Sequence, residues 1–448
     1  MTSPLFSRMC HQAASMLLYG LLLFTPLARG SVHPWAQTVI LLAVVVLLLL
    51  LVLEWLAGQF GQTRPLRGFA PLRLYRTTLD VPLLALLLLV LLSAVFSPYG
   101  QYTAEAIGLF LSYLALFYIT LYTVRTRKQQ RTLVSVLIGV AVLLALVGFL
   151  KRLDLLPVSW WTYPHQLSTG YSISGPFGNR NHLAGYLEMV IPLVVGLFLA
   201  KKRRSPVFSV LLCLTVFLVA AHIFSFSRGG WLSLSLGLTA MALVLLTQER
   251  FQSKMILSLL LAGFFAVLLF ILSSREIVER ILTLTTEQTI MEIGGRRAIW
   301  AEVFTMIGDF PLLGSGPGSF ATVYLRYHPP VLARFFEAHN DYLHFTAEIG
   351  LPFIPLLCLL LAVIFRQGWR RMAGRGNQLW SITLSALTGL AAILIHSCFD
   401  FNLHVPANAL LATVLVALIF CRVDDGLRQT CPPPAPRSLT GERKPPAR

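Results

Sequence analysis

Long apolar runs, separated by short polar segments, dominate the chain and predict a bundle of membrane-spanning helices. About twelve runs of roughly 17 to 25 residues occur, and a helix of this length crosses the hydrocarbon core of a bilayer. We therefore predict an all-α polytopic membrane protein. The predicted spans are residues 12–30, 35–57, 79–97, 103–124, 132–151, 183–200, 206–225, 231–247, 255–272, 345–365, 379–397 and 404–421.

One polar segment, residues 273–344, is too long to be a simple connector between spans. Within it, Ile299, Trp300, Val303 and Ile307 follow helical spacing, and the stretch DFPLLGSGPG that begins at Asp309 should end this helix. We interpret the segment as a partly helical lid on the outer membrane face. The predicted organisation is nine spans in residues 1–272, the lid in 273–344, three spans in 345–421 and a disordered, proline-rich tail in 422–448.

Composition and charge fit this topology. The 448 residues are 56% hydrophobic and 12% charged, which excludes an ordinary soluble globular protein. Twenty-five of the 36 lysines and arginines fall in alternate loops, so the positive-inside rule predicts that both termini are cytoplasmic. The net charge of +17 then reflects basic loops that face the anionic inner leaflet and orient the protein in the membrane. No nucleic-acid partner is expected. The first apolar run is interpreted as an uncleaved anchor, and the scattered cysteines predict no disulfide framework.

Polar clusters gather on the predicted outer side, where the topology gives no reason for basic residues. They are GPFGNRNH at 175–182, FSFSRGGW at 224–231, GGRRAIW at 294–300 and AHNDYLHF at 338–345. Charged side chains at the membrane are costly and are usually kept for a function. The clusters therefore predict an anion-handling active site at the outer membrane surface.

Three arginines are the candidate anion ligands. Arg228 follows a predicted span directly and is either a snorkelling arginine or, with Ser225 and Ser227, part of an anion pocket whose glycines admit a phosphate to the backbone. Arg296 and Arg297 are expected at the start of the lid helix, where the helix N-terminus adds positive potential. The alternative for this pair is a solvated surface position.

His339 is the candidate general base, since imidazole exchanges protons near neutral pH and Asn340 and Asp341 offer orienting hydrogen bonds. A packed or capping histidine is the alternative. His344 and Glu348, four residues apart on one helix face, could pair or bind a metal. We expect pairing and no metal, because no third ligand has zinc-site spacing.

Further polar groups are expected to support the site. Asn181 and His182 precede a predicted span, and Glu188 lies inside it, either as a functional carboxylate or as the ion-pair partner of an arginine. The last outer loop is expected to line the site or to be structural, through His396, Asp400, Asn402 and His404.

In combination, GPFGNRNH, SRGGW, GRRAIW, DFPLLGSGPGSF and AHNDYL resemble the O-antigen ligase family over roughly residues 170–365. The resemblance implies a membrane glycosyltransferase with a GT-C-like arrangement of helices. It assigns the catalytic base to His339 and diphosphate binding to Arg228 and Arg296, with Arg297 assisting. Supporting roles are expected for Asn181, His182, Glu188, Ser227, Asn340 and Asp341.

The reaction implied is inverting transfer of a glycan from undecaprenyl diphosphate to an acceptor hydroxyl, without a cofactor, on the periplasmic face of a bacterial inner membrane. The acceptor is expected to be the lipid A core. Polymerases and protein O-oligosaccharyltransferases are the related alternatives, and Phe353, where ligases usually have a small or polar residue, weakens the ligase assignment. A transporter or flippase is the alternative from another class; the almost uniformly apolar spans favour an enzyme.

Overall fold

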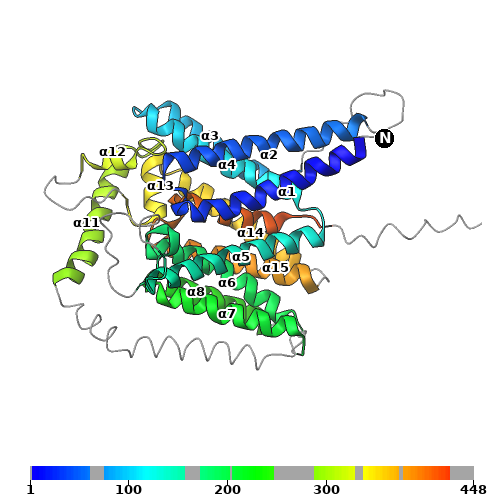
Figure 1. Cartoon of the computed structure of the whole chain (residues 1–448). Helices are drawn as coiled ribbons and strands as arrows, with labels where there is room; N and C mark the ends of the chain where they lie inside the picture. The colour runs from blue at the N-terminus through cyan, green and yellow to red at the C-terminus, as the bar shows by residue number, and fades with distance from the viewer. Residues whose placement is uncertain are drawn as a thin grey trace, which may run out of the picture.

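A computed structural model of the protein describes residues 3–60, 75–156, 172–201, 204–246, 287–327, 337–372 and 377–423. Every regular element within these ranges is a helix, so the all-α prediction is confirmed there (Figure 1). The α-helices are α1 (Ser3–Leu27), α2 (Pro34–Phe60), α3 (Asp80–Val95), α4 (Gly100–Thr123), α5 (Arg127–Arg152), α6 (Arg180–Leu199), α7 (Pro206–Phe224), α8 (Arg228–Leu246), α11 (Glu287–Asp309), α12 (Phe320–Tyr324), α13 (Asp341–Ile349), α14 (Phe353–Met372), α15 (Asn377–His396) and α16 (Pro406–Phe420).

The protein is a multi-pass membrane protein. Among the described residues, eight helices are long and apolar enough to cross a bilayer, namely α1, α2, α4, α5, α6, α7, α8 and α14. Three shorter apolar helices, α3, α15 and α16, coincide with three further predicted spans. The span predicted at 255–272, the start of the lid segment and most of the predicted tail lie outside the described residues. A total of about twelve spans therefore stays a prediction.

The span predicted at 345–365 is wrong in its boundaries. Helix α13 ends just before Gly350, and a separate helix, α14, begins at Phe353. Gly350 has φ +87°, and a Cβ atom there would lie 2.3 Å from the carbonyl oxygen of Leu312. The segment 310–318 packs against this break: the Ser315 amide donates to the Ala347 carbonyl at 2.9 Å, and the Gly316 amide donates to the Glu348 carbonyl at 2.8 Å. The glycine-rich loop thus anchors the lid to α13 as well as ending α11.

Helix α6 forms the centre of the bundle and packs closely against α15. Small residues allow this approach, as is common where helices meet in membranes. A Cβ atom on Gly196 would lie 2.0 Å from Oγ of Ser385, and one on Gly389 would lie 2.5 Å from the carbonyl oxygen of Met189. This central pair fixes the ends of the helices on which the candidate residues lie.

Three 3-10 turns meet at one end of the bundle, which we call the lid end: η1 (Arg29–Ser31), η3 (Gly175–Phe177) and η5 (Asn402–His404). Helices α11, α12 and α13 lie at the same end (Figure 1). The Ile173 amide donates to the Phe224 carbonyl at 2.9 Å, and the Asp341 amide donates to the Ser397 carbonyl at 2.9 Å. The prediction that the polar clusters come together on one side of the bundle is therefore confirmed.

The lid has a small apolar core of its own. The predicted helical stripe is present on α11, where Ile299 and Val303 are buried. They pack with Phe320 and Tyr324 of α12. This core holds α11 against α13, and so next to the segment that carries His339.

Candidate active site

His339 and Asp400 meet at the lid end. Nδ1 of His339 lies 3.6 Å from Oδ1 of Asp400, whose side chain is only 2% exposed, whereas the histidine side chain is 23% exposed. The side chain of Asn181, at the start of α6, donates a hydrogen bond to the other oxygen of Asp400. A carboxylate on Nδ1 favours the tautomer that leaves the Nε2 lone pair for a substrate proton.

The Asp400 carboxyl stays ionised in this setting. Burial opposes its ionisation, but the close contact with His339 and the electrostatic effect of His182 and His396 outweigh burial and hold the pKa of Asp400 below its ordinary range. A charged, buried carboxylate can stabilise the imidazolium that forms when His339 accepts a proton.

The turn that carries His339 is tied to the last loop. Asn340 caps α13 by accepting from the amides of Tyr342 at 3.0 Å and Leu343 at 3.1 Å, and its own Nδ2 donates to the Cys398 carbonyl at 3.1 Å. His339 has φ +47°, a left-handed conformation that non-glycine residues seldom adopt. Surrounding contacts therefore impose its orientation, as expected of a functional residue.

His182 is a packed residue behind the candidate base. It is 7% exposed, its Nε2 lies 3.3 Å from Nδ2 of Asn179, and its ring meets Phe401 edge-on at 4.9 Å between centroids. The ring of His339 contacts the same phenylalanine at 5.3 Å. Phe401 therefore packs between the rings of His182 and His339 and helps to position His339.

Glu188 pairs with a histidine, not with an arginine, among the described residues. Nδ1 of His396 lies 3.1 Å from Oε1 of Glu188, which is fully buried, and Nε2 of His396 lies 3.4 Å from Oγ of Ser227. Ser227 also accepts from the Gly230 amide at 3.2 Å, so it caps the start of α8. This chain of three polar groups fixes the turn that presents Arg228.

Arg228 is exposed at the first position of α8, next to this network. The following glycines serve helix packing. A Cβ atom on Gly229 would lie 2.9 Å from Cδ2 of His396, and one on Gly230 would lie 2.9 Å from Cβ of Ala184. The start of α8 can therefore lie close to α6 and α15. The guanidinium of Arg228 is then presented at the lid end of the bundle.

The prediction that Arg296 and Arg297 open the lid helix is wrong, because α11 begins at Glu287 and both arginines lie in its third turn. They therefore gain nothing from the helix N-terminus. Arg296 lies on the face of Trp300, four residues on, whose Nε1 donates to the Ala338 carbonyl at 3.0 Å. Arg296 is half-buried on this face, and Arg297 is exposed beside it.

His344 and Glu348 pair as expected, with 3.5 Å between Nε2 and Oε1. Sequence spacing offered no third ligand, but η5 brings His404 to the same place as this pair. Asp341 was predicted to orient His339. It instead accepts a hydrogen bond from Nδ1 of His404 at 2.6 Å.

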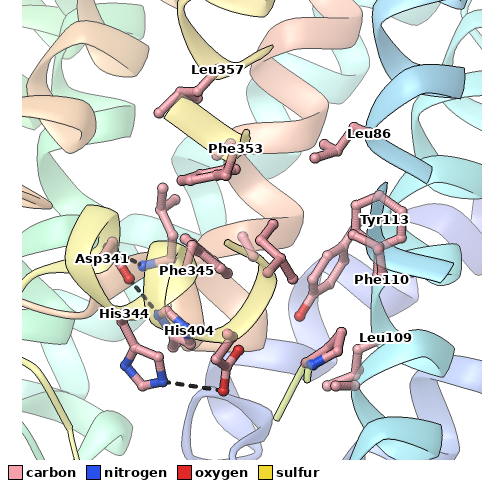
Figure 2. A pocket seen from close by; sticks show the side chains of 18 of the residues that line it. Leu86, Leu109, Phe110, Tyr113, Asp341, His344, Phe345, Phe353, Leu357 and His404 are labelled. Atoms are coloured by element: carbon pink, nitrogen blue, oxygen red, sulfur yellow. Dashed lines mark hydrogen bonds and ion pairs between the residues drawn. The ribbon is translucent and has the colours of Figure 1, made fainter. Parts of the chain in front are cut away.

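A cavity of about 590 Å³ extends from these histidines into the bundle between α3, α4, α13, α14 and α16. Its wall is mainly apolar, and Figure 2 shows the acidic and histidine side chains gathered at one end. Labelled apolar residues in this view are Leu86, Leu109, Phe110, Tyr113, Phe345, Phe353 and Leu357. A cavity of this composition suits the hydrocarbon part of a lipid.

Sequence reasoning undervalued two residues, Asp400 and His396, which it placed only among general lining groups. The available signal was that His396 lies at the end of a predicted span and Asp400 lies just beyond it, where charged and titratable groups are costly without partners. Their partners come from α6, α8 and the segment before α13, far away in the chain.

Comparison with known proteins agrees with the motif resemblance. Residues 213–358, which include Arg228, Arg296, Arg297 and His339, match the model of a protein family described as O-Antigen ligase. No curated protein matches the chain.

Proposed function

Because residues 213–358 carry an O-antigen ligase domain, we propose that this membrane enzyme transfers a glycan from undecaprenyl diphosphate to an acceptor hydroxyl. The observation that carries the proposal is the pairing of His339 with the buried, ionised Asp400 beside the turn that presents Arg228. A positioned base and exposed arginines at one end of a membrane bundle suit a lipid-linked donor with a diphosphate leaving group.

The chemistry follows from these groups. Arg228 and Arg296 would bind the diphosphate, with Arg297 at the edge, and stabilise the negative charge that grows as the bond from the anomeric carbon to the phosphate oxygen breaks. The acceptor oxygen forms the new bond to that carbon and gives its proton to Nε2 of His339. The diphosphate keeps the electron pair of the broken bond, and a single displacement inverts the anomeric centre.

The supporting residues hold this geometry. Asn181 and Asp400 orient His339, and Asn340 fixes the turn on which it lies. Glu188, through His396, holds Ser227 at the cap of α8. The apolar cavity is of a kind that accommodates a lipid chain, which supports a lipid-linked substrate over a soluble sugar nucleotide.

The lipid A core is the acceptor we propose, which makes the protein an O-antigen ligase of the inner membrane with its site on the periplasmic face. A second repeat unit as acceptor would make it a polymerase, and a serine or threonine hydroxyl would make it a protein O-oligosaccharyltransferase. All three use the same base and the same leaving group.

The test is transfer by the purified protein in lipid nanodiscs with an undecaprenyl-diphosphate-linked glycan. Separate reactions supply lipid A core, a second donor molecule or a pilin-like peptide, and NMR of the product reports the anomeric configuration. We expect transfer to lipid A core with inversion, and none with His339→Ala. Transfer to another acceptor would contradict the ligase assignment. Flipping of the donor across vesicle membranes without any transfer would contradict the proposed glycosyltransferase activity.

A further inference from the structure

A cluster of three metal-ligating side chains lies between α13 and the last turn, beside the candidate active site. His344 and Glu348 project from one face of α13, and His404 comes from η5. The nearest ligand atoms of the three side chains lie within 4.8 Å of one another. Figure 2 shows His344 and His404 at the polar end of the cavity, with Asp341 next to them.

A carboxylate lies beside the second ring nitrogen of each imidazole. Asp341 accepts from Nδ1 of His404 at 2.6 Å, and Oε2 of Glu337 lies 3.3 Å from Nδ1 of His344, an ion-pair contact without hydrogen-bond geometry. Histidines that bind metals almost always give their second ring nitrogen to such a carboxylate or carbonyl, which fixes the tautomer and frees the ligating nitrogen. Both Nε2 atoms are left for a ligand.

The ligating atoms include an unsatisfied one. Nε2 of His404 is buried and has no hydrogen-bond partner among the described residues. Nε2 of His344 lies 3.5 Å from Oε1 of Glu348, and tetrahedral zinc ligands at about 2.0–2.2 Å from the ion are separated by about that distance. The rings of His344 and His404 stack with 3.8 Å between centroids, so the two imidazoles are close enough to serve one ion once His404 turns toward it.

Charge also favours a cation at this place. Three carboxylates, Glu337, Asp341 and Glu348, face two imidazoles, and none of the described residues that line the cavity is a lysine or arginine. Burying carboxylates without enough positive charge is costly. A bound divalent cation offsets that cost.

We propose that His344, Glu348 and His404 bind a divalent transition-metal cation of the zinc type, with Asp341 and Glu337 orienting the two imidazoles. Two imidazole nitrogens and one carboxylate oxygen suit zinc and leave a fourth coordination position. All three ligands line the cavity, so that position faces it. The cation joins α13 to η5 and so braces the two segments that carry His339 and Asp400. This inference concerns metal binding and does not depend on the transferase proposal.

The experiment uses the untagged full-length protein in detergent, stripped of metal with a chelator and desalted. Zinc is added, bound zinc is counted by mass spectrometry, and the Kd is measured against a chromophoric chelator. We expect one zinc ion per chain, loss of binding in His344→Ala and His404→Ala, and an affinity about 10–100-fold lower in Asp341→Asn, which removes an outer carboxylate. His33→Ala is the matched control and should bind as the unmodified protein does.

A second measurement separates lost ligands from lost folding. Cobalt substituted for zinc should show visible absorption bands of a tetrahedral site with a nitrogen and oxygen donor set, and Glu348→Gln, which keeps the size of the side chain, should abolish them. Zinc should raise the thermal unfolding midpoint of the unmodified protein and leave that of folded His404→Gln unchanged. Equal zinc affinity in the unmodified protein and the double variant His344→Ala/His404→Ala would overturn the proposal, whatever the transferase assay gives.

Discussion

The carboxylate of Asp400 lies 3.6 Å from Nδ1 of His339 and connects the loop before η5 to the segment before α13. This contact orients the imidazole of His339. The carboxylate beside Nδ1 favours the tautomer with the proton on Nδ1, which leaves the lone pair on Nε2 at the opposite edge of the ring. The strained φ of +47° at this histidine is kept because hydrogen bonds of the adjacent Asn340 fix the turn.

We predict that Asp400→Asn lowers the rate of transfer by about 10²-fold or more, since the amide keeps the shape of the carboxylate but cannot stabilise the imidazolium. Initial rates in nanodiscs measure the effect, and gel filtration verifies that the variant is folded. Asp309→Asn is the control, because Asp309 accepts from the Tyr327 hydroxyl at 2.6 Å within the lid. Unchanged transfer by Asp400→Asn would remove this residue from the mechanism.

Arg228→Ala should lower transfer by about 10²–10³-fold, the range found when one donor to a developing negative charge is removed. Arg228→Lys should recover part of the rate, because lysine keeps the charge but not the two-pronged geometry of guanidinium. The control is Arg326→Ala, an exposed arginine of the lid whose guanidinium lies 5.6 Å from the centre of the Tyr99 ring. Equal losses in Arg228→Ala and Arg326→Ala would point to a general effect of charge.

The two arginines of α11 should differ in their effects. Arg296 lies on the helix face of Trp300, whose indole holds the Ala338 carbonyl beside His339, and Arg297 is exposed on an adjacent face. We therefore expect the larger loss of kcat/KM in Arg296→Ala, by about tenfold or more relative to Arg297→Ala, since a charged hydrogen bond contributes about 1.5–3 kcal/mol. Kinetics with varied donor concentration measure the difference. The reverse order would show that α11 presents its other face to the donor.

Local sequence patterns predicted the features that depend on neighbours along the chain. The buried stripe of Ile299 and Val303 follows from helical spacing, and the pairing of His344 with Glu348 follows from a separation of four residues on a helix. Apolar length located the described spans, because the cost of exposing backbone groups to hydrocarbon requires helices there.

Features that depend on distant segments were not predicted. The loop 310–318 packs against α13 at the break, and no pattern within 345–365 shows that contact, although Gly350 and Pro352 are local signals for the end of a helix. The partner of Glu188 is His396, on a helix that packs against α6 from near the end of the chain. His404 joins His344 and Glu348 in the same way, so spacing along the sequence concealed the third side chain of the proposed metal site.

The ionised Asp400 carboxyl should make the stability of the protein depend on pH. Burial opposes ionisation of Asp400, but the contact with His339 and the nearby histidines lower its pKa in the folded protein. A carboxyl whose pKa falls on folding contributes stability above its unfolded pKa of about 3.9, and this contribution is lost as the pH falls through the folded value. The difference in Tm between the unmodified protein and Asp400→Asn should therefore stay constant between about pH 5 and about pH 8 and shrink below about pH 4.

Thermal unfolding in one detergent at a series of pH values measures this difference. Asp309→Asn again provides the comparison, since Asp309 lies within the lid and its Tm difference should reflect only the hydrogen bond from Tyr327. A Tm difference for Asp400→Asn that vanished between about pH 5 and about pH 7 would mean that the carboxyl takes up a proton in that range. Asp400 would then be neutral where the enzyme works, and it could not stabilise a protonated His339.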